Sequence, residues 1–319
     1  MRIGFYQPHL CLFGTTVSMF DYANFNPTLL GNESIIFYDK DDTRNNEDII
    51  IKFEEAEIPT ISLSGHENME ELSANLDFHE VDALYIQKTG KPGGRWVDNT
   101  PCFIHCVGCE NDPHGHVYAY VSDWLSQQMT GGQSPVVPYM AHLPDHQDNF
   151  REELGIPKEA VVFGRLGGFY SWNIPFVNNV IKDVLKERDD VYFLFAQTTI
   201  PFSDKRVIHV EPFADLYTKR KFINTSDAFL HARNEGESFG MAVAEFSISN
   251  KPTITYENSP EKNHIYQLGD KGIYYKNSED LKDILLNFEV DNSKNWNAYS
   301  DFAPEKIIQK FKEVFINSL

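Results

Sequence analysis

Short apolar runs alternate with amphipathic, helix-like stretches along the whole chain. In the first half, the apolar runs predict strands near residues 2–6, 34–38, 60–63, 82–87, 102–106 and 136–138. In the second half, they predict strands near residues 161–165, 191–196, 207–210, 227–231, 252–255 and 272–275. Helical patterns separate most of these strands, and such alternation is typical of βαβ units with parallel sheets. The sequence therefore predicts an α/β fold.

A polar stretch with a proline, residues 143–149, interrupts this alternation near the middle of the chain. We interpret it as a linker and predict two Rossmann-like domains, residues 1–147 and 148–300. The chain has 319 residues, of which 41% are hydrophobic, and this is enough for two domains with separate cores. A last helix is predicted over residues 304–319, after a stretch rich in Asn, Asp and Ser.

The formal net charge of −19 argues against a nucleic-acid partner, because phosphate backbones require a basic surface. No apolar run approaches the ~20 residues that a membrane-spanning helix needs. The first six residues are typical of a core strand rather than a signal peptide. We therefore expect a cytoplasmic protein without a transmembrane segment.

The segment from Leu230 to Glu245 carries the most informative chemistry. A helix is predicted from Met241 to Ile248, so the turn before it falls at the carboxyl end of strand 227–231, where open α/β sheets bind ligands. Gly240 allows a ligand to approach the backbone closely. The amides of Phe239, Gly240 and Met241 would point outward at the positive end of the helix dipole, which suits a diphosphate.

Two acids flank this turn. Glu237 lies before the predicted helix and Glu245 about two turns into it, so they are too far apart to share a proton. An ionised carboxylate accepts hydrogen bonds from both hydroxyls of a vicinal diol, which ribose and hexoses both offer. The two acids would therefore bind different parts of a sugar-diphosphate-nucleoside. The alternative is an amphipathic helix with two solvated acids.

The segment Glu237-Ser-Phe-Gly-Met-Ala-Val-Ala-Glu245 resembles the E-x7-E signature of family-4 retaining glycosyltransferases, which have the GT-B fold. Other segments resemble the family in the expected order, up to about residue 290. They are the first strand with the turn at Gly14, the strand ending at His105, the serine-capped helix after Ser122, the strand at 136–138, and the strand carrying Arg165.

The resemblance implies two Rossmann-like domains facing across a cleft, with the acceptor on the N-terminal side and the donor on the C-terminal domain. It implies transfer of a sugar from a nucleotide-diphosphate-sugar to a hydroxyl of a glycan, lipid or small molecule, with retention at the anomeric carbon. It also implies that segment 301–319 packs back on the N-terminal domain. Neither a cofactor nor an obligate metal is expected, because an arginine and a helix terminus would stabilise the diphosphate.

The resemblance also assigns roles to individual residues. His105 and Glu237 would act at the reacting sugar, and Glu245 would hold the ribose diol. The remaining donor-binding residues would be Gly14, Arg165, Ser238, Phe239, Gly240 and Met241.

One departure from the family pattern concerns the diphosphate. Members usually carry a lysine five residues after the arginine, where this chain has Tyr170. Lys205, Arg206 or the basic loop with Lys88, Lys91 and Arg95 are candidate substitutes, although that loop is equally typical of a solvated turn. The departure supports one alternative, a non-catalytic sugar-nucleotide-binding subunit. An epimerase or phosphorylase of the same fold is the other alternative.

Two other features have competing interpretations. His105 is either the catalytic histidine of the family or a structural residue near a strand end. The cluster Cys102, Cys106, Cys109, His114 and His116 contains zinc ligands, but it lacks a complete zinc-binding spacing. We therefore predict no metal site and interpret Cys102 and Cys106 as small buried side chains on one face of a strand.

Overall fold

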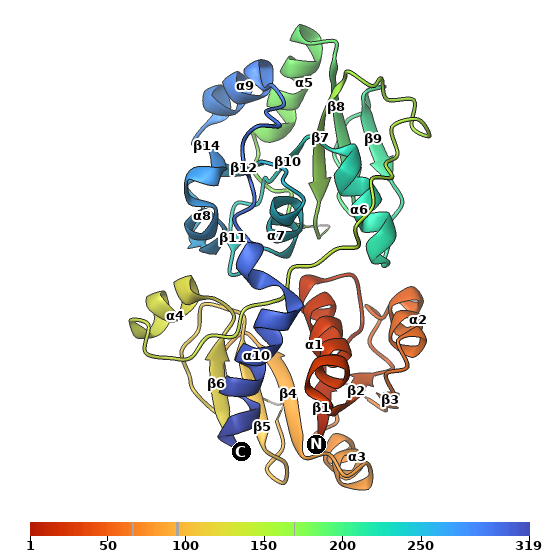
Figure 1. Ribbon diagram of the computed structural model, residues 1–319, viewed down its shortest axis with the longest axis vertical. Coiled ribbons are helices and arrows are strands. Elements are labelled where there is room, and N and C mark those ends of the chain that lie inside the picture. The colour runs from red at the N-terminus through yellow and green to blue at the C-terminus, as the bar shows by residue number, and fades with distance from the viewer. Residues whose placement is uncertain (66, 94–95, 169) are drawn as a thin grey trace. The chain divides into compact units, whose positions relative to one another are not determined.

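The computed structural model describes residues 1–65, 67–93, 96–168 and 170–319. The chain forms two compact units, each built around a six-stranded sheet (Figure 1). The first unit contains residues 1–140 and 301–319, and the second contains residues 141–300. All described strand pairs are parallel. The predicted α/β class with two Rossmann-like domains is confirmed.

The first sheet has the strand order β3-β2-β1-β4-β5-β6. Its strands are β1 (Arg2–Tyr6), β2 (Glu33–Asp39), β3 (Thr60–Leu63), β4 (Ala83–Lys88), β5 (Cys102–Cys106) and β6 (Val117–Tyr120). Its helices are α1 (Gly14–Leu30), α2 (Glu47–Glu55), α3 (Met69–Phe78), α4 (Asp123–Thr130) and α10 (Pro304–Val314), with short 3-10 turns at η2 (Ser300–Phe302) and η3 (Ile316–Ser318).

The second sheet has the strand order β14-β12-β10-β7-β8-β9. Its strands are β7 (Val161–Leu166), β8 (Val191–Ala196), β9 (Val207–Val210), β10 (Ala228–Leu230), β12 (Thr253–Tyr256) and β14 (Gly272–Tyr275). The helices are α5 (Val177–Glu187), α6 (Leu216–Thr225), α7 (Met241–Ile248), α8 (Asn263–Leu268) and α9 (Ser278–Asn287), with a 3-10 turn at η1 (Gly269–Lys271). Two short strands of the same unit, β11 (Gly236–Glu237) and β13 (Glu261–Lys262), form a separate parallel pair.

Both sheets have the doubly wound order of a dinucleotide-binding fold. The direction of winding reverses between β1 and β4 in the first sheet, and between β7 and β10 in the second. Ligands of such folds bind outside the carboxyl ends of the strands at this reversal. The ends of β7 and β10 are therefore the place in the second unit where a ligand site is expected.

Alternation along β10 shows how helices cover both faces of the second sheet. Ala228 and Leu230 belong to the apolar core formed with α5 and α9. Phe229, between them, points to the opposite face and stacks on Phe246 of α7 at a centroid distance of 4.4 Å. Both faces of the strand are buried, as expected of a central parallel strand.

The terminal helix α10 completes the core of the first unit. Its Phe311 stacks on Tyr22 of α1 at 4.9 Å and on Phe5 of β1 at 6.4 Å. Farther along the chain, Phe315 stacks on Phe103 of β5 at 5.4 Å. The helix has apolar residues on one face and charged residues on the other, and it buries the apolar face against this sheet. Residues 301–319 are thus an integral part of the first unit.

Three local expectations have different outcomes. The helix predicted from Met241 to Ile248 is confirmed, as is the cap at Ser122, whose hydroxyl accepts from the Leu125 amide at 3.2 Å. The strand predicted at residues 136–138 is wrong, since only Val136 bridges to Tyr120 and β6 forms the edge of the sheet instead. Prolines on both sides of this short run remove the backbone donors that a ladder requires.

Among the described residues, no helix combines the length and the apolar character needed to cross a membrane.

Replacing Phe311 with alanine should remove about 3–5 kcal/mol from the free energy of unfolding, because a fully buried ring leaves a cavity between helix and sheet. Urea denaturation followed by circular dichroism measures the change. Lys312→Ala, at the exposed neighbouring position, is the matched control and should change stability by less than about 0.5 kcal/mol. Equal stabilities of the two variants would contradict the role of α10 in the core.

Candidate functional site

The predicted donor residues of the second unit gather at the carboxyl ends of β7 and β10. Arg165 is the penultimate residue of β7. His231 directly follows β10, and the segment that it begins continues through β11 to the start of α7. Sequence positions more than sixty residues apart therefore meet at the point where the winding of the sheet reverses. This is the position at which open α/β sheets bind ligands.

Glu237 is held by both of its carboxylate oxygens. His231 Nε2 lies 3.1 Å from Oε1, and Arg233 Nη1 donates to Oε2 at 2.9 Å. The side chain is 21% exposed. Because a carboxylate oxygen accepts two hydrogen bonds, each oxygen retains a lone pair for a ligand.

The charge of Glu237 is stabilised by these partners. Burial alone would raise the pKa of the carboxyl, but the hydrogen bond from His231 and the charge of Arg233 outweigh burial and hold the pKa at about 2. Burial also lowers the pKa of His231, against the opposing effect of Glu237. At neutral pH the site therefore contains a carboxylate beside a neutral imidazole.

Gly236 fixes the backbone that carries Glu237. It has φ of +79°, and a Cβ at this position would lie 1.9 Å from the carbonyl oxygen of Glu261. This close approach is part of the β11–β13 pairing, in which Gly236 aligns with Glu261 and Glu237 with Lys262. Only glycine satisfies both the positive φ and the lack of space.

Arg165 is enclosed beneath the turn after β7. Its Nη2 donates to the carbonyl and the hydroxyl of Ser171 at 2.9 and 2.7 Å, and Gly167 provides the space for the guanidinium. The residue is 2% exposed, and burial lowers its pKa to about 10, so it remains charged at neutral pH. Within the described part of the chain, Nε has no hydrogen-bond partner. Its charge is near Glu237, although the guanidinium does not present an exposed bidentate fork.

The start of α7 has the predicted form. Gly240 is the N-cap residue with φ of +92°, and no side chain caps the helix. The amides of the first turn, beginning with Met241, have no acceptor within the helix. The carbonyl of Phe239 accepts from the Asn263 amide at 2.9 Å, which fixes the turn, and Ser238 is half-buried beside it. The helix N-terminus thus lies immediately after Glu237.

Glu245 is buried and paired. Lys219 Nζ of α6 lies 2.7 Å from its Oε1, and the side chains are 11% and 5% exposed, respectively. The interpretation of Glu245 as a solvated acid is therefore wrong. Its buried position next to a cation leaves Oε2 as the oxygen available to a ligand.

Sequence reasoning missed several members of this site. Arg233 lies four residues before the E-x7-E segment, but nothing in its spacing assigned it to Glu237. Asn173 donates to the carboxylate of Glu235 at 2.9 and 3.0 Å and accepts from the Asn234 amide at 2.8 Å, so it braces the same loop. Lys219 comes from a helix whose sequence resembles an ordinary amphipathic surface helix. Only the tertiary structure reveals these contacts.

Two candidate substitutes for the missing lysine are excluded by their positions. Tyr170, which occupies the position of the family lysine, is 90% exposed. Arg206 donates to the carbonyl oxygens of Leu185 and Arg188, so it stabilises the end of α5. It directly precedes β9, and Lys205 stands one residue earlier, so both lie at the amino edge of the parallel sheet, a strand length away from the ends of β7 and β10.

The basic loop belongs to the first unit. Lys88, at the end of β4, donates to the Gly93 carbonyl at 2.9 Å. Lys91 pairs with Glu110 at 2.9 Å, while Arg95 lies outside the described residues. The described part of this loop is thus stabilised by its own contacts.

His105 lies in the core of the first unit. It is fully buried, its Nδ1 is 2.5 Å from the Tyr85 hydroxyl, and the rings of Tyr22, Tyr139 and Phe315 surround it. Burial lowers its pKa to about 3. This environment favours the structural interpretation of His105.

Gly14 begins α1 at the carboxyl end of β1 and is exposed. This is the ligand-binding edge of the first sheet.

The cysteine and histidine cluster is dispersed between the two ends of β5. Cys102 and Cys106 are buried in β5, and their thiols donate to the carbonyls of Thr100 and Gly108 at 3.4 and 3.3 Å. Cys109 is exposed. Across the described residues, no group of three or more His, Cys, Asp or Glu side chains is arranged to hold a metal ion.

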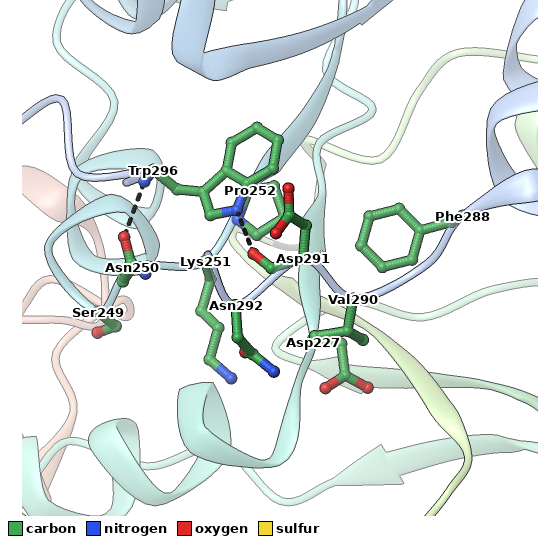
Figure 2. A pocket seen from close by; sticks show the side chains of 10 residues that line it. All are labelled: Asp227, Ser249, Asn250, Lys251, Pro252, Phe288, Val290, Asp291, Asn292 and Trp296. Atoms are coloured by element: carbon green, nitrogen blue, oxygen red, sulfur yellow. Dashed lines mark hydrogen bonds between the residues drawn. The ribbon is translucent and has the colours of Figure 1, made fainter. Parts of the chain in front are cut away.

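A pocket of about 140 Å³ opens at the other edge of the second sheet (Figure 2). Asp227 and Pro252, which line it, directly precede β10 and β12, so the pocket lies at the amino ends of these strands. Trp296 closes one side, and its backbone amide donates to the Asn250 side chain at 2.7 Å. No residue of the predicted donor site lines this pocket. It is distinct from the site at the carboxyl edge.

No protein-family model matches the sequence, and no curated protein sequence matches it. Solved structures, however, match its whole length. The HepE protein of Anabaena in complex with UDP-glucose has a TM-score of 0.74 at 14% identity, with full coverage of both chains. A glycosyltransferase from Rickettsia africae has a TM-score of 0.71 at 14% identity, covering 99% of this chain and 98% of that one.

A putative UDP-N-acetylglucosamine 2-epimerase from Listeria monocytogenes has a TM-score of 0.65 at 11% identity, covering 100% of this chain and 96% of that one. At such identities the similarity establishes the fold. The chain has the two-domain α/β fold of GT-B glycosyltransferases.

Gly236→Ala should lower the free energy of unfolding by at least about 3 kcal/mol, because the new methyl group would displace the Glu261 carbonyl as well as adopt a positive φ. The matched control is Gly155→Ala, which also has a positive φ but open space around it and should cost about 1 kcal/mol. Urea denaturation of both variants measures the difference. Similar losses would show that the β11–β13 contact does not constrain Gly236.

Proposed function

We propose that this protein is a glycosyltransferase that moves a sugar from a nucleotide-diphosphate-sugar to a hydroxyl of a glycan, lipid or small-molecule acceptor. The observation that carries the proposal is the convergence of Glu237, Arg165 and the α7 N-terminus at the winding reversal of the second sheet. The similarity to a solved structure that binds UDP-glucose supports this proposal. Retention at the anomeric carbon is part of the proposal, on the basis of the E-x7-E resemblance.

The diphosphate would lie over the start of α7. The first-turn amides supply hydrogen-bond donors and the positive end of the helix dipole. Arg165 would contribute its buried charge, which is effective over a short distance because little water screens it. In place of the family lysine we propose Arg233, whose guanidinium is one-third exposed and already lies at Glu237. These groups would stabilise the charge that develops on the leaving diphosphate.

Glu245 would bind the ribose. Lys219 neutralises one of its oxygens, so the carboxylate stays buried without an unpaired charge. Its other oxygen would accept hydrogen bonds from the ribose hydroxyls. A nucleotide that lacks one of these hydroxyls would bind less tightly.

Glu237 would bind hydroxyls of the transferred sugar. Its ionised state makes it an acceptor only, and one lone pair on each oxygen is left by His231 and Arg233. Two neighbouring hydroxyls of a hexose fit this arrangement. We propose that no metal ion is required, since cationic side chains and amides surround the leaving group.

A nucleotide-sugar epimerase is the second candidate, and the similarity to the Listeria structure favours it. An epimerase changes the sugar of the donor without any acceptor. Incubation of the protein with donor alone, followed by proton NMR of the sugar, separates the two activities. A non-catalytic subunit, suggested by the exposed Tyr170, would bind donor and leave it unchanged under all conditions.

The donor site is tested by calorimetry against UDP-, GDP-, ADP- and TDP-sugars without metal. One nucleotide should bind selectively, and Glu245→Gln should weaken it at least about tenfold by removing a charged acceptor. The 2′-deoxy form of that nucleotide should lose affinity for the wild type and lose little more for the variant. Glu159→Gln, an exposed acid before the amino end of β7, is the control. Failure to bind any nucleotide-sugar would exclude the proposed function.

Turnover tests the catalytic role of Glu237. Glu237→Gln should lower kcat by about 10²–10³-fold while the affinity for the free nucleotide changes little, because Glu237 contacts the sugar and not the base. The control is Glu279→Gln in the first turn of α9, which should retain wild-type kcat.

Addition of EDTA should leave the wild-type rate unchanged. Loss of activity with EDTA would contradict the metal-free proposal, and NMR of the product anomeric proton reports retention.

A further inference from the structure

A chain of three buried polar side chains lies behind Glu237. His231 Nδ1 is 2.8 Å from the hydroxyl oxygen of Thr255, and the same oxygen is 3.0 Å from His264 Nε2. All three residues are at most 1% exposed. They come from the end of β10, the middle of β12 and the start of α8. Nothing in the E-x7-E segment predicts Thr255 or His264 as part of this site.

The chemistry of these groups allows one arrangement of protons when both rings are neutral. Glu237 is an acceptor only, so His231 must carry its proton on Nε2 to form the 3.1 Å contact. His231 Nδ1 is then an acceptor, and the single hydroxyl proton of Thr255 must be donated to it. The oxygen of Thr255 can then only accept from the third member, so His264 must carry its proton on Nε2.

The remaining ring nitrogen agrees with this direction. His264 Nδ1 is buried, and within the described residues it has no hydrogen-bond partner. An unprotonated nitrogen can tolerate this position better than an N–H that needs an acceptor. Burial lowers the pKa of His264 to about 3 and also lowers that of His231, so both rings are neutral.

We propose that His264, Thr255 and His231 form a one-directional hydrogen-bond relay, with every proton donated toward Glu237, and that Thr255 is the positioning residue that joins the two rings by donating to His231 Nδ1. The relay holds the Nε2–H tautomer of His231 against Oε1 of Glu237. Arg233 holds Oε2, so the carboxylate plane has two fixed contacts. The remaining lone pairs then point in defined directions toward the sugar hydroxyls. The catalytic part of this inference rests on the proposed function, whereas the tautomers do not.

The position of His264 links the relay to the helix N-terminus as well. A Cβ on Gly240 would lie 3.5 Å from Cβ of His264 and 3.3 Å from Cβ of Glu237. Glu237, Gly240 and His264 are therefore in mutual proximity around the N-cap of α7. A shift of the relay would move both the carboxylate and the first-turn amides.

The direction of the relay is tested first in the wild-type protein. Proton–nitrogen correlation NMR of the histidine rings distinguishes the two neutral tautomers, and His231→Gln and His264→Gln assign the signals. Both rings should show Nε2–H with an unprotonated Nδ1, and the His231 Nδ1 shift should indicate a hydrogen-bonded acceptor. An Nδ1–H tautomer or an imidazolium at His231 would overturn the proposal without any variant of Thr255.

Thr255→Val and Thr255→Ser test the positioning role. Valine keeps the shape but removes the hydroxyl, so the His231 Nδ1 signal should lose its hydrogen-bond shift and kcat should fall about tenfold, while nucleotide affinity stays within about twofold. Serine keeps the hydroxyl and should retain both the signal and, within about threefold, kcat. Wild-type spectra and kcat in a folded Thr255→Val protein would overturn the proposal, as would equal losses in the two variants.

The failure of the proposed function would be recognised separately. If the tautomers and their response to Thr255→Val are as expected but no nucleotide-sugar binds the wild-type protein, the relay stands and the donor assignment of Glu237 fails. If donor binds and turns over while His231 shows the wrong tautomer, the proposed function stands and the relay is excluded.

Discussion

A carboxylate charge held in a largely enclosed position is the constraint on which the site of the second unit depends. Glu237 can remain ionised there only because an imidazole N–H and a guanidinium contact its two oxygens. An unpartnered buried charge would be far more costly than the small net stability of a domain allows. The need for these contacts explains the glycine at position 236, since only this backbone conformation brings the strand pair β11–β13 and the carboxylate into place. It also explains why a histidine follows β10.

The second acid of the motif meets the same constraint by a different route. Glu245 is paired with a lysine from α6, and both side chains are withdrawn from solvent. The two acids thus have cationic partners from different elements, Arg233 on the adjacent loop and Lys219 on a distant helix. Each carboxylate can bind a ligand only through the oxygen lone pairs that these internal contacts do not use. This division gives Glu237 two acceptor positions and Glu245 one free oxygen.

Much of the fold could be predicted from the sequence because the information is local. Alternating apolar runs identified most strands, and the α7 boundaries follow from the glycine turn and the apolar helix after it. The error at residues 136–138 arose because the neighbouring prolines lack backbone donors, so the pairing with Tyr120 does not extend beyond one bridge. The site was only partly predictable. Contacts such as those of Lys219 or Thr255 join segments that are distant in sequence, and neither residue has a spacing that reveals its partner. Arg206 was misjudged although it directly precedes the predicted strand 207–210, a position that already indicates the amino edge of a parallel sheet.

The placement of α10 has a consequence for how the polypeptide acquires its structure during synthesis. The first unit is assembled from the beginning and the end of the chain, and the whole second unit is translated between these parts. The aromatic surface around Tyr22 and Phe5 therefore stays uncovered until Phe311 has left the ribosome. The second unit, which is continuous in sequence, can complete its core earlier. Multidomain proteins usually complete their N-terminal domain first during synthesis. In this chain, the N-terminal unit is the one that completes its core last.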